Sequence, residues 1–277
     1  TGFDIYTRAV SDVYQDLYGE GIFTGKGIYE VDVLRKVLEH RFPTNALLSH
    51  DLIEGAYSRA GLLSDVEMID DYPSHYSAYN RRKHRWLRGD WQIVRWLFAW
   101  VPSESGRLVR NPISLVSRLK IFDNLRRSLV EPGTFALLLS GWFFLPGGPM
   151  TWTCIVAGLL FLPALFQFGF GVVRFFIARK WIVLQDAATT LMNAFGAVFL
   201  TIIFLAHQAL VSLDAIIRTI IRSTITRSRL LEWETATEAE LGVRKRTPVD
   251  TYLNLMPLLS IVLGTIIFLF HPKKRYF

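Results

Sequence analysis

Residues 150–173 read MTWTCIVAGLLFLPALFQFGFGVV and contain no charged residue. This run is longer than the roughly 18–20 residues that a helix needs to cross the hydrocarbon layer of a bilayer. With the other apolar runs, the predicted spans are residues 133–147, 150–173, 190–213 and 253–271. The first is short, because Pro132 and a Pro-Gly-Gly-Pro turn bound it. The sequence therefore predicts a region of transmembrane helices over residues 131–277.

The composition and the charge pattern agree with a membrane protein. Hydrophobic residues make up 51% of the 277 residues, more than a soluble domain of this size needs. Residues 81–130 hold twelve Lys or Arg against three acids, directly before the first span. Such a block is typical of the cytoplasmic side and of contact with anionic lipid, and nucleic-acid binding is the weaker interpretation. The single cysteine, Cys154, lies in an apolar run and is predicted to be a packing residue.

The positive charges leave one conflict about topology. Four crossings would return Lys273, Lys274 and Arg275 to the side of the N-terminal region, as the positive-inside rule favours. The same count places the basic loop 214–252 on the opposite side. Isoleucines and arginines lie on opposite faces of residues 213–230, which predicts a segment along the membrane interface. A re-entrant third span would then reconcile the loop with the rule.

Residues 1–110 carry mixed helix and strand patterns, which predict an α/β region. Helices are predicted at residues 4–17, 30–40, 50–60 and 75–100, with a strand at 65–71. In residues 112–129, apolar residues recur at helical spacing opposite arginines. This fits either an amphipathic interfacial helix over residues 111–130 or an ordinary helix facing a core. The adjoining membrane span favours the interfacial helix.

Two polar clusters in this region could carry chemistry. Asp51 follows Ser49-His50 at the start of a predicted helix, where a carboxylate stays ionised and could act as a base on a sugar hydroxyl. A helix cap is the simpler interpretation of Asp51 taken alone. The second cluster is residues 81–92, RRKHRWLRGDWQ.

On a helix, Arg82 and Arg85 share one face and could hold a diphosphate, while Trp86 could stack on a sugar ring. The alternative is a solvated basic face with tryptophans at the membrane interface. Taken alone, the cluster leaves both interpretations open.

The order of these elements resembles a known family. A glycine-rich Phe23-Thr-Gly-Lys-Gly27 segment, Ser49-His50-Asp51, Arg82-x-x-Arg85-Trp86, an amphipathic helix and membrane spans follow one another. Processive family-2-type membrane glycosyltransferases show this order, usually with Thr-Glu-Asp and Gln-x-x-Arg-Trp. The variants here, together with GEGIFTGKGIYE at 19–30, LSHDLIEG at 48–55 and LLEWET at 230–235, are similar to the cyclic β-1,2-glucan synthases over nearly the whole chain.

The resemblance implies that residues 1–110 are the C-terminal part of a cytoplasmic, GT-A-like α/β glycosyltransferase domain. It also implies inverting transfer from UDP-glucose to a growing β-1,2-glucan at a bacterial inner membrane. Asp51 would be the general base, and it would border a common cleft with Trp86. The implied substrate-binding residues are Gly25, Lys26, Gly27, Arg82, Arg85 and Trp86.

The family's metal motif has no counterpart before Asp51, and the pair Asp70-Asp71 comes after it. A divalent Mg²⁺ or Mn²⁺ is therefore expected in the full-length enzyme, with ligands outside this chain. The chain is expected to be a fragment that is inactive alone. Its partners would be the upstream transferase half and a downstream phosphorylase-like domain of the parent.

Two other function classes compete with the enzyme. A transporter or channel subunit would use the polar residues Asp186, Asn193 and His207 near the apolar spans. A structural membrane anchor would bind partners through its N-terminal region. Neither accounts for the ordered carboxylate and Arg-x-x-Arg-Trp elements.

Overall fold

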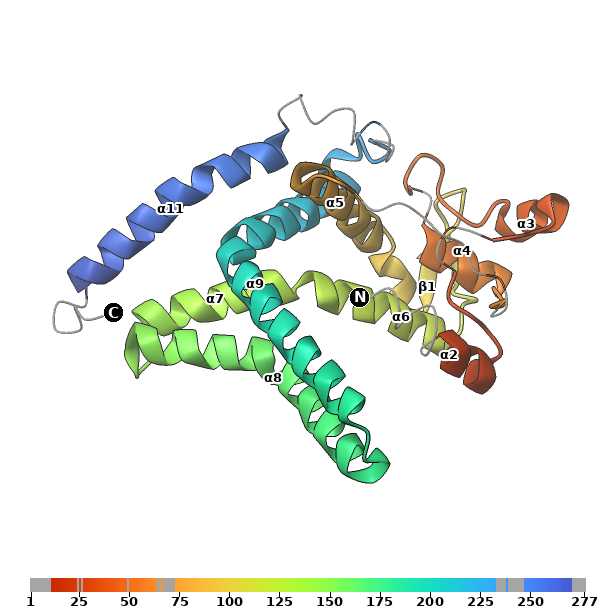
Figure 1. The fold of residues 1–277 in the computed structure, drawn as a ribbon. Coiled ribbons are helices and arrows are strands. Elements are labelled where there is room, and N and C mark those ends of the chain that lie inside the picture. Colours follow the sequence, from red (N-terminus) through yellow and green to blue (C-terminus); the bar gives the residue numbers. More distant parts are fainter. Residues whose placement is uncertain are drawn as a thin grey trace. The chain divides into compact units, whose positions relative to one another are not determined.

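The computed structural model describes residues 11–23, 25, 27–48, 50–63, 66, 73–232, 238 and 247–270. The described chain is mostly helical (Figure 1). It divides into two compact units, one of Thr1–Leu129 with Ser212–Val249 and the other of Val130–Val211 with Asp250–Phe277. The long helix α9 (Trp181–Ile221) contributes its last turns to the first unit and the rest to the second.

The first unit contains the short helices of the N-terminal region. Its elements are α2 (Ser11–Tyr18), α3 (Val31–Leu38), α4 (Asp51–Ser58), α5 (Tyr76–Gln92), the 3₁₀ helix η2 (Val94–Leu97), β1 (Trp100–Pro102), β2 (Leu108–Arg110) and α6 (Leu115–Ser128). Side chains cap two of these helices. Glu30 accepts a hydrogen bond from the Val33 N–H at the start of α3, and Ser114 accepts one from the Ser117 N–H at the start of α6. The structure thus contains helices where they are predicted, within residues 30–40 and within residues 111–130.

The helix predicted over residues 75–100 is wrong beyond Gln92, where α5 ends. The chain continues through η2 into β1. The side-chain amide of Asn111 donates hydrogen bonds to the carbonyls of Trp96 and Phe98, at 2.7 and 2.9 Å. The Trp96 and Phe98 carbonyls therefore accept hydrogen bonds from a side chain rather than from the backbone of a longer helix. A local pattern does not predict this, because the donor comes from the far end of the following hairpin.

The predicted α/β transferase fold is not shown by the described residues. Their one sheet is an antiparallel pair of three-residue strands, β1 and β2, with Trp100 opposite Arg110. Strands joined by so short a turn form a hairpin, whereas an α/β layer needs parallel strands and crossover helices. The predicted strand at 65–71 falls almost wholly outside the described residues.

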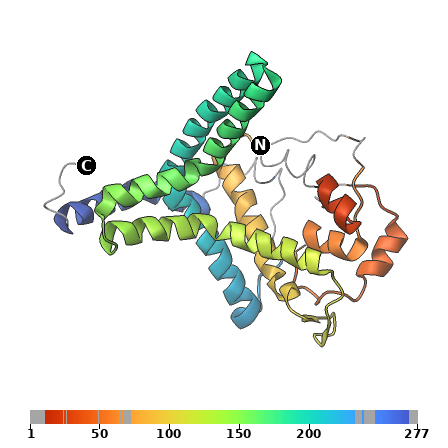
Figure 2. The same ribbon diagram turned by 90° about the horizontal axis from the view of Figure 1, so that it is seen from below.

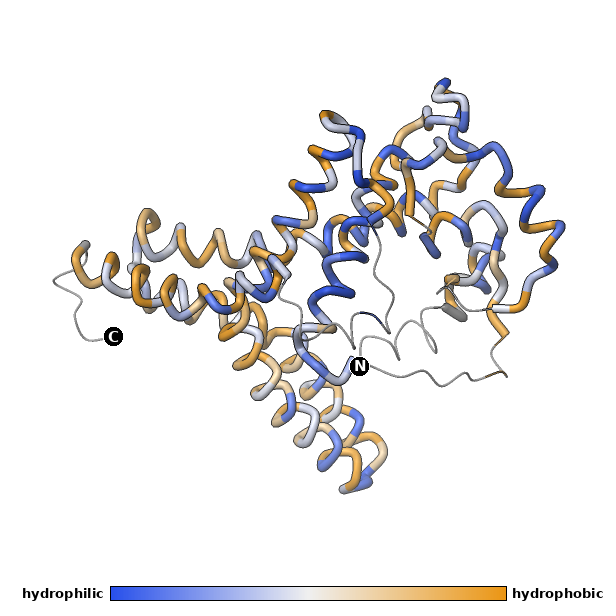
Figure 3. The backbone as a smooth tube through the Cα atoms, turned by 90° about the horizontal axis from the view of Figure 1, so that it is seen from above, coloured by the Kyte–Doolittle hydropathy of each residue, from blue (hydrophilic) through white to orange (hydrophobic). Residues whose placement is uncertain are grey.

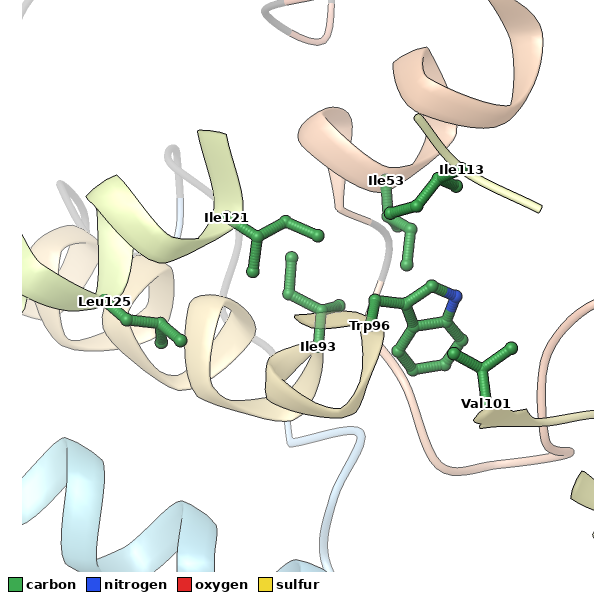
Figure 4. Packing of buried hydrophobic residues seen from close by; sticks show 7 residues of the cluster. All are labelled: Ile53, Ile93, Trp96, Val101, Ile113, Ile121 and Leu125. Carbon is green, nitrogen blue, oxygen red and sulfur yellow. The ribbon is translucent and has the colours of Figure 1, made fainter. Parts of the chain in front are cut away.

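A small apolar core holds the first unit together (Figure 4). Its side chains come from α4, η2, β1, α6, the residue after α5 and the segment before α6, namely Ile53, Ile93, Trp96, Val101, Ile113, Ile121 and Leu125. The indole N–H of Trp96 donates a hydrogen bond to the Tyr57 hydroxyl at 3.0 Å, so its one polar atom is satisfied. This core holds α4 against η2 and α6, and thereby places the first residue of α4.

The second unit contains the long apolar helices. They are α7 (Val130–Phe143), α8 (Gly148–Ala178), most of α9, and α11 (Pro248–Phe270). Among the described residues, α8, α9 and α11 are long and apolar enough to cross a membrane, each with a mean hydropathy of 2.0. Figure 3 shows hydrophobic residues along much of these helices. The chain is therefore a membrane protein.

The first predicted span, at 133–147, is not among the three candidate spans. The corresponding helix α7 has 14 residues. At 1.5 Å per residue it extends about 21 Å, against the ~30 Å of hydrocarbon in a bilayer. Four full crossings are thus not supported by the helix lengths.

Close contacts join α7 to α8. The indole N–H of Trp142 donates to the Thr153 hydroxyl at 3.0 Å, and that of Trp152 donates to the Pro146 carbonyl at 2.9 Å. Gly141 faces Trp152 so closely that any Cβ there would overlap it. Farther along, α8 and α9 run side by side as a hairpin (Figure 2), with the rings of Phe161 and Phe195 4.6 Å apart.

The predicted basic loop 214–252 begins as helix. α9 continues to Ile221, a π-helical turn η3 (Arg222–Thr226) follows, and α11 begins at Pro248. The helix continues through the predicted segment 213–230 as far as residue 226. The predicted separation of isoleucines from arginines is wrong, because Ile217 and Ile221 line the same groove as Arg218 and Arg222. Its position at a membrane interface stays a prediction.

Candidate active site

Asp51 is the first residue of α4, and His50 occupies the cap position before it. The backbone N–H of His50 donates a hydrogen bond to Glu54 Oε1 at 3.1 Å, which closes the first turn. Asp51 is therefore not the helix cap that the simpler interpretation predicts. Its carboxylate lies at the positive end of the helix dipole, which favours the ionised form.

The glycine-rich loop touches this carboxylate. Gly25 has a positive φ of 84°, and a Cβ built on it would lie 2.8 Å from both carboxylate oxygens of Asp51. The loop backbone thus approaches Asp51 as closely as a residue without a side chain allows. A Cβ on Gly27 would meet Phe23 Cε2 at 3.4 Å, an ordinary contact. Lys26 lies outside the described residues.

The environment of Asp51 changes its acidity. Partial burial of the carboxylate by the neighbouring chain raises its pKa. The nearby charges of His50 and Arg85 lower it, and Glu54 raises it. Arg85 on α5 therefore acts on the same carboxylate that Gly25 touches. A base whose pKa is raised toward the working pH is better matched to accept a proton from a hydroxyl.

Arg82 and Trp86, one turn apart on α5, form a second contact. The guanidinium carbon of Arg82 lies 5.2 Å from the centre of the Trp86 ring, a cation–π distance. Trp86 is 44% exposed, so part of its ring is available to a ligand. Arg82 Nε is buried without a hydrogen-bond partner among the described residues. A buried donor of Arg82, unpaired within the described part of the chain, therefore lies beside a partly exposed aromatic ring.

The structure thus links the predicted site residues in two groups. Gly25 and Arg85 act on Asp51, while Arg82 lies over Trp86. A small cavity near α4 is lined by Leu52, Gly55 and Ala56 rather than by Asp51, together with Glu20, Gly21, Ile22, Phe23, Ser117 and Lys120. The predicted cleft shared by Asp51 and Trp86 stays a prediction.

The sequence did not reveal a buried link behind Asp51. The ring Nε2 of His50 lies 3.1 Å from Asp90 Oδ1 at the end of α5, and Asn124 Nδ2 of α6 donates to the same oxygen at 2.9 Å. A Cβ on Gly89 would come within 3.0 Å of His50 Cδ2. The dipeptide Gly89-Asp90 lies 40 positions from His50. Nothing local to either stretch indicates that they meet.

A second set of contacts ties α5 to residues 214–232. His84 Nε2 lies 2.8 Å from Asp214 Oδ2. Gln92 accepts a hydrogen bond from the Leu48 N–H at 3.0 Å and donates one to the Leu230 carbonyl at 2.9 Å. Gln92 thus joins the segment before Asp51 to the LLEWET stretch, which begins at residue 230.

The polar residues of the transporter alternative do not form one site. Asp186, Asn193 and His207 all lie on α9. An α-helix rises 1.5 Å per residue, so Asp186 and His207 are about 30 Å apart along it. His207 is buried at 1% exposure, whereas Asp186 and Asn193 are exposed.

The described residues include no group of three or more His, Cys, Asp or Glu side chains placed to hold a metal ion. They therefore do not fit the divalent ion that the resemblance implies. Its ligands stay an expectation for the longer parent protein.

Comparison with known proteins supports the resemblance. The chain is 37% identical over 243 residues to Cyclic beta-(1,2)-glucan synthase NdvB of Rhizobium meliloti (strain 1021). The match covers 86% of this chain and 8% of that protein, so the chain spans less than a tenth of its curated relative. No protein-family model matches the chain. The similarity to cyclic β-1,2-glucan synthases over most of the chain is confirmed, and it is consistent with a fragment of a longer protein.

Proposed function

We propose, from the similarity of this chain to a segment of a cyclic β-glucan synthase, that it forms the acceptor side of an inverting membrane glycosyltransferase. The donor would be UDP-glucose and the acceptor a growing β-1,2-glucan. The observation that carries the proposal is the environment of Asp51. The Gly25 backbone touches its carboxylate, Arg85 acts on it electrostatically, and partial burial raises its pKa.

In the proposed reaction, Asp51 accepts the proton of the acceptor hydroxyl. The resulting oxygen nucleophile attacks the anomeric carbon of UDP-glucose as the bond from that carbon to the diphosphate oxygen breaks. UDP leaves with the electron pair, and the configuration of the carbon inverts. Trp86 would hold the acceptor ring by stacking, and Arg82 and Arg85 would stabilise the departing diphosphate.

The residues behind Asp51 would serve to position it. His50 is fixed by Asp90, and Asp90 also accepts a hydrogen bond from Asn124 of α6. The N-terminus of α4 is therefore held by side chains from α5 and α6. Such support fits a base, because small displacements of a reacting group reduce the rate strongly.

A divalent ion, when bound, would neutralise charge on the leaving diphosphate. Its ligands would come from parts of the parent outside this chain, as would a phosphorylase-like domain. The active form is thus the full-length parent at a bacterial inner membrane, with the N-terminal region cytoplasmic. The fragment alone would be inactive.

The test is Asp51→Asn in the full-length parent protein. If Asp51 is the base, glucose transfer from labelled UDP-glucose into glucan falls by about 10²- to 10⁴-fold. UDP-glucose binding, measured by calorimetry, stays near the wild-type value, because Asp51 does not hold the donor.

Asp123→Asn is the matched control, since this carboxylate on α6 is exposed and pairs with Arg126 and Arg127. It should leave transfer unchanged. Full transfer by the Asp51→Asn protein would refute the proposal.

A further inference from the structure

An open groove of about 570 Å³ lies where α9 ends and the chain turns back. Its lining residues all belong to the first unit. They are Asp214, Ile217, Arg218, Ile221, Arg222, Thr226, Ser228 and Arg229. The lining therefore combines three arginines and one carboxylate with two hydroxyls and two isoleucines.

The charges in the groove do not cancel. Arg218 donates to both carboxylate oxygens of Asp214, at 2.8 and 3.0 Å, so these two neutralise each other. Arg222 donates to Glu232 at 2.6 Å and keeps 12% of its side chain exposed. Arg229 is 74% exposed, and it lies 3.9 Å from the same Glu232. Among the described residues, Glu232 is thus shared by two arginines, and the groove residues together carry net positive charge.

The electrostatics of the neighbouring helix agree with this excess. Burial lowers the pKa of Arg88, on α5, and the charge of Arg222 lowers it further. Hydrogen bonding from Arg222 lowers the pKa of Glu232, which stays ionised. The charges of Arg222 and Arg218 thus act on Arg88, while those of Glu232 and Asp214 act on it in the opposite direction.

The backbone shapes the open end of the groove. The π-helical turn η3 ends α9, and Arg227 and Arg229 then adopt positive φ angles of 48° and 53°. These reversals bring Ser228 and Arg229 back over the helix end, beside Thr226. Two hydroxyls and an exposed guanidinium are suitable donors for the oxygens of a phosphate.

The groove also has an apolar side at the end of a candidate membrane span. Ile217 and Ile221 line it and are 52% and 40% exposed. α9 with its π-turn is a candidate span over Trp181–Thr226. A ligand that joins a phosphate to hydrocarbon would satisfy both sides, whereas a free phosphate would leave the isoleucines exposed to water.

We propose that this groove binds the headgroup phosphate of an anionic phospholipid, with Arg222 and Arg229 as its charged contacts. The acyl chains would lie along Ile217 and Ile221. The proposal goes beyond glucan synthesis, because it assigns a lipid site apart from Asp51 and Trp86.

The test uses the full-length protein in a non-ionic detergent. Mixed micelles carry phosphatidylglycerol or phosphatidylcholine with the same fluorescent acyl label, and binding is measured by anisotropy. The wild type is expected to prefer phosphatidylglycerol. Arg222→Gln with Arg229→Gln should weaken that binding by at least 10-fold, since each cation near an anionic lipid contributes roughly five-fold. Binding of phosphatidylcholine should stay the same.

Arg107→Gln with Arg110→Gln is the matched control, because it removes the same charge from exposed positions around the β1–β2 hairpin. It should leave phosphatidylglycerol binding within about two-fold. Arg229→Gln alone replaces the double variant if the latter does not fold, since Arg229 is largely exposed.

Three results would overturn the proposal. The first is equal phosphatidylglycerol binding in the wild type and the arginine variants, and the second is no preference for the anionic headgroup. The third is displacement of the lipid by millimolar inorganic phosphate, which would assign the groove to a soluble phosphate.

Discussion

At the residue scale, the charge of Arg85 acts on the Asp51 carboxylate from a different helix. Burial raises the pKa of Asp51, and the charges of His50 and Arg85 lower it. If Asp51 is the base, the rate falls as the pH drops through this pKa. Arg85→Gln removes a lowering charge, so the acid limb of kcat/KM should move to higher pH. The pH profile of the full-length enzyme measures this shift.

Arg82→Gln is the control for that profile, because Arg82 is not among the groups that shift the pKa of Asp51. It should reduce the rate with the acid limb in place. An acid limb that does not move in Arg85→Gln would mean that another group titrates.

The Gly25 loop gives a second residue-scale prediction. In Gly25→Ala, the new Cβ would collide with the Asp51 carboxylate, and φ of 84° is unfavourable for alanine. A carboxylate can swing aside, so the main expected effect is a misplaced base, with transfer reduced by about 10- to 100-fold. Initial rates of glucan formation in the full-length enzyme measure this.

Gly27→Ala is the matched control in the same loop, since its Cβ would only touch Phe23 at 3.4 Å. It should lose clearly less activity than Gly25→Ala, because its Cβ does not meet the Asp51 carboxylate. Equal losses in both variants would indicate a general sensitivity of the loop rather than a contact with Asp51.

At the element scale, α6 combines the two predicted interpretations of its pattern. Ile121 and Leu125 are buried in the core of the first unit, as in a core-facing helix. Leu115, Leu119 and Phe122 are 71%, 57% and 54% exposed. An exposed apolar stripe next to membrane spans supports the interfacial position, which stays a prediction. The sequence alone did not show which apolar residues of this helix face the core and which are exposed. Apolar residues on two adjacent faces of a helix produce a single periodic pattern.

The α7–α8 contact allows a stability prediction. Gly141→Ala would place a Cβ on Trp152, which is held by its hydrogen bond to Pro146. Overpacking of this kind costs about 1–3 kcal/mol, so the unfolding temperature in detergent should fall. Gly133→Ala, on the same helix, has no atom within 4 Å of its Cβ and should leave the temperature equal or slightly higher. A similar temperature for both variants would show that α7 and α8 do not pack in this way.

At the scale of the whole molecule, residues 212–249 belong to the same compact unit as the N-terminal region. They pack with residues 1–129, through contacts such as His84 with Asp214 and Gln92 with Leu230. Segments that pack together lie on one side of a membrane. We therefore expect the chain between them to make an even number of crossings, which α8 and α9 would provide without α7. The basic residues of 214–232 then share the side of the basic N-terminal region, as the positive-inside rule favours.

Cysteine labelling tests this topology. The native Cys154 is first replaced by alanine, and single cysteines are placed at the exposed positions Ser105, Lys180 and Ser223. A maleimide that does not cross membranes should label Ser105→Cys and Ser223→Cys from the same side, and Lys180→Cys, between α8 and α9, from the other. Opposite labelling of the first two would mean that α7 also crosses the membrane.

The amino-acid sequence alone determined the long apolar helices and the capped helices of the N-terminal region, and it predicted residues for the candidate site. Periodicity, length and capping are local properties, so they can be read from neighbouring residues. The end of α5 at Gln92, the link from His50 to Asp90 and the return of residues 212–249 to the first unit were decided by tertiary structure alone. These depend on contacts between residues 13 to 138 positions apart, such as Asn111 with Phe98 and Gln92 with Leu230. No local pattern specifies such contacts, because they form only when the chain packs.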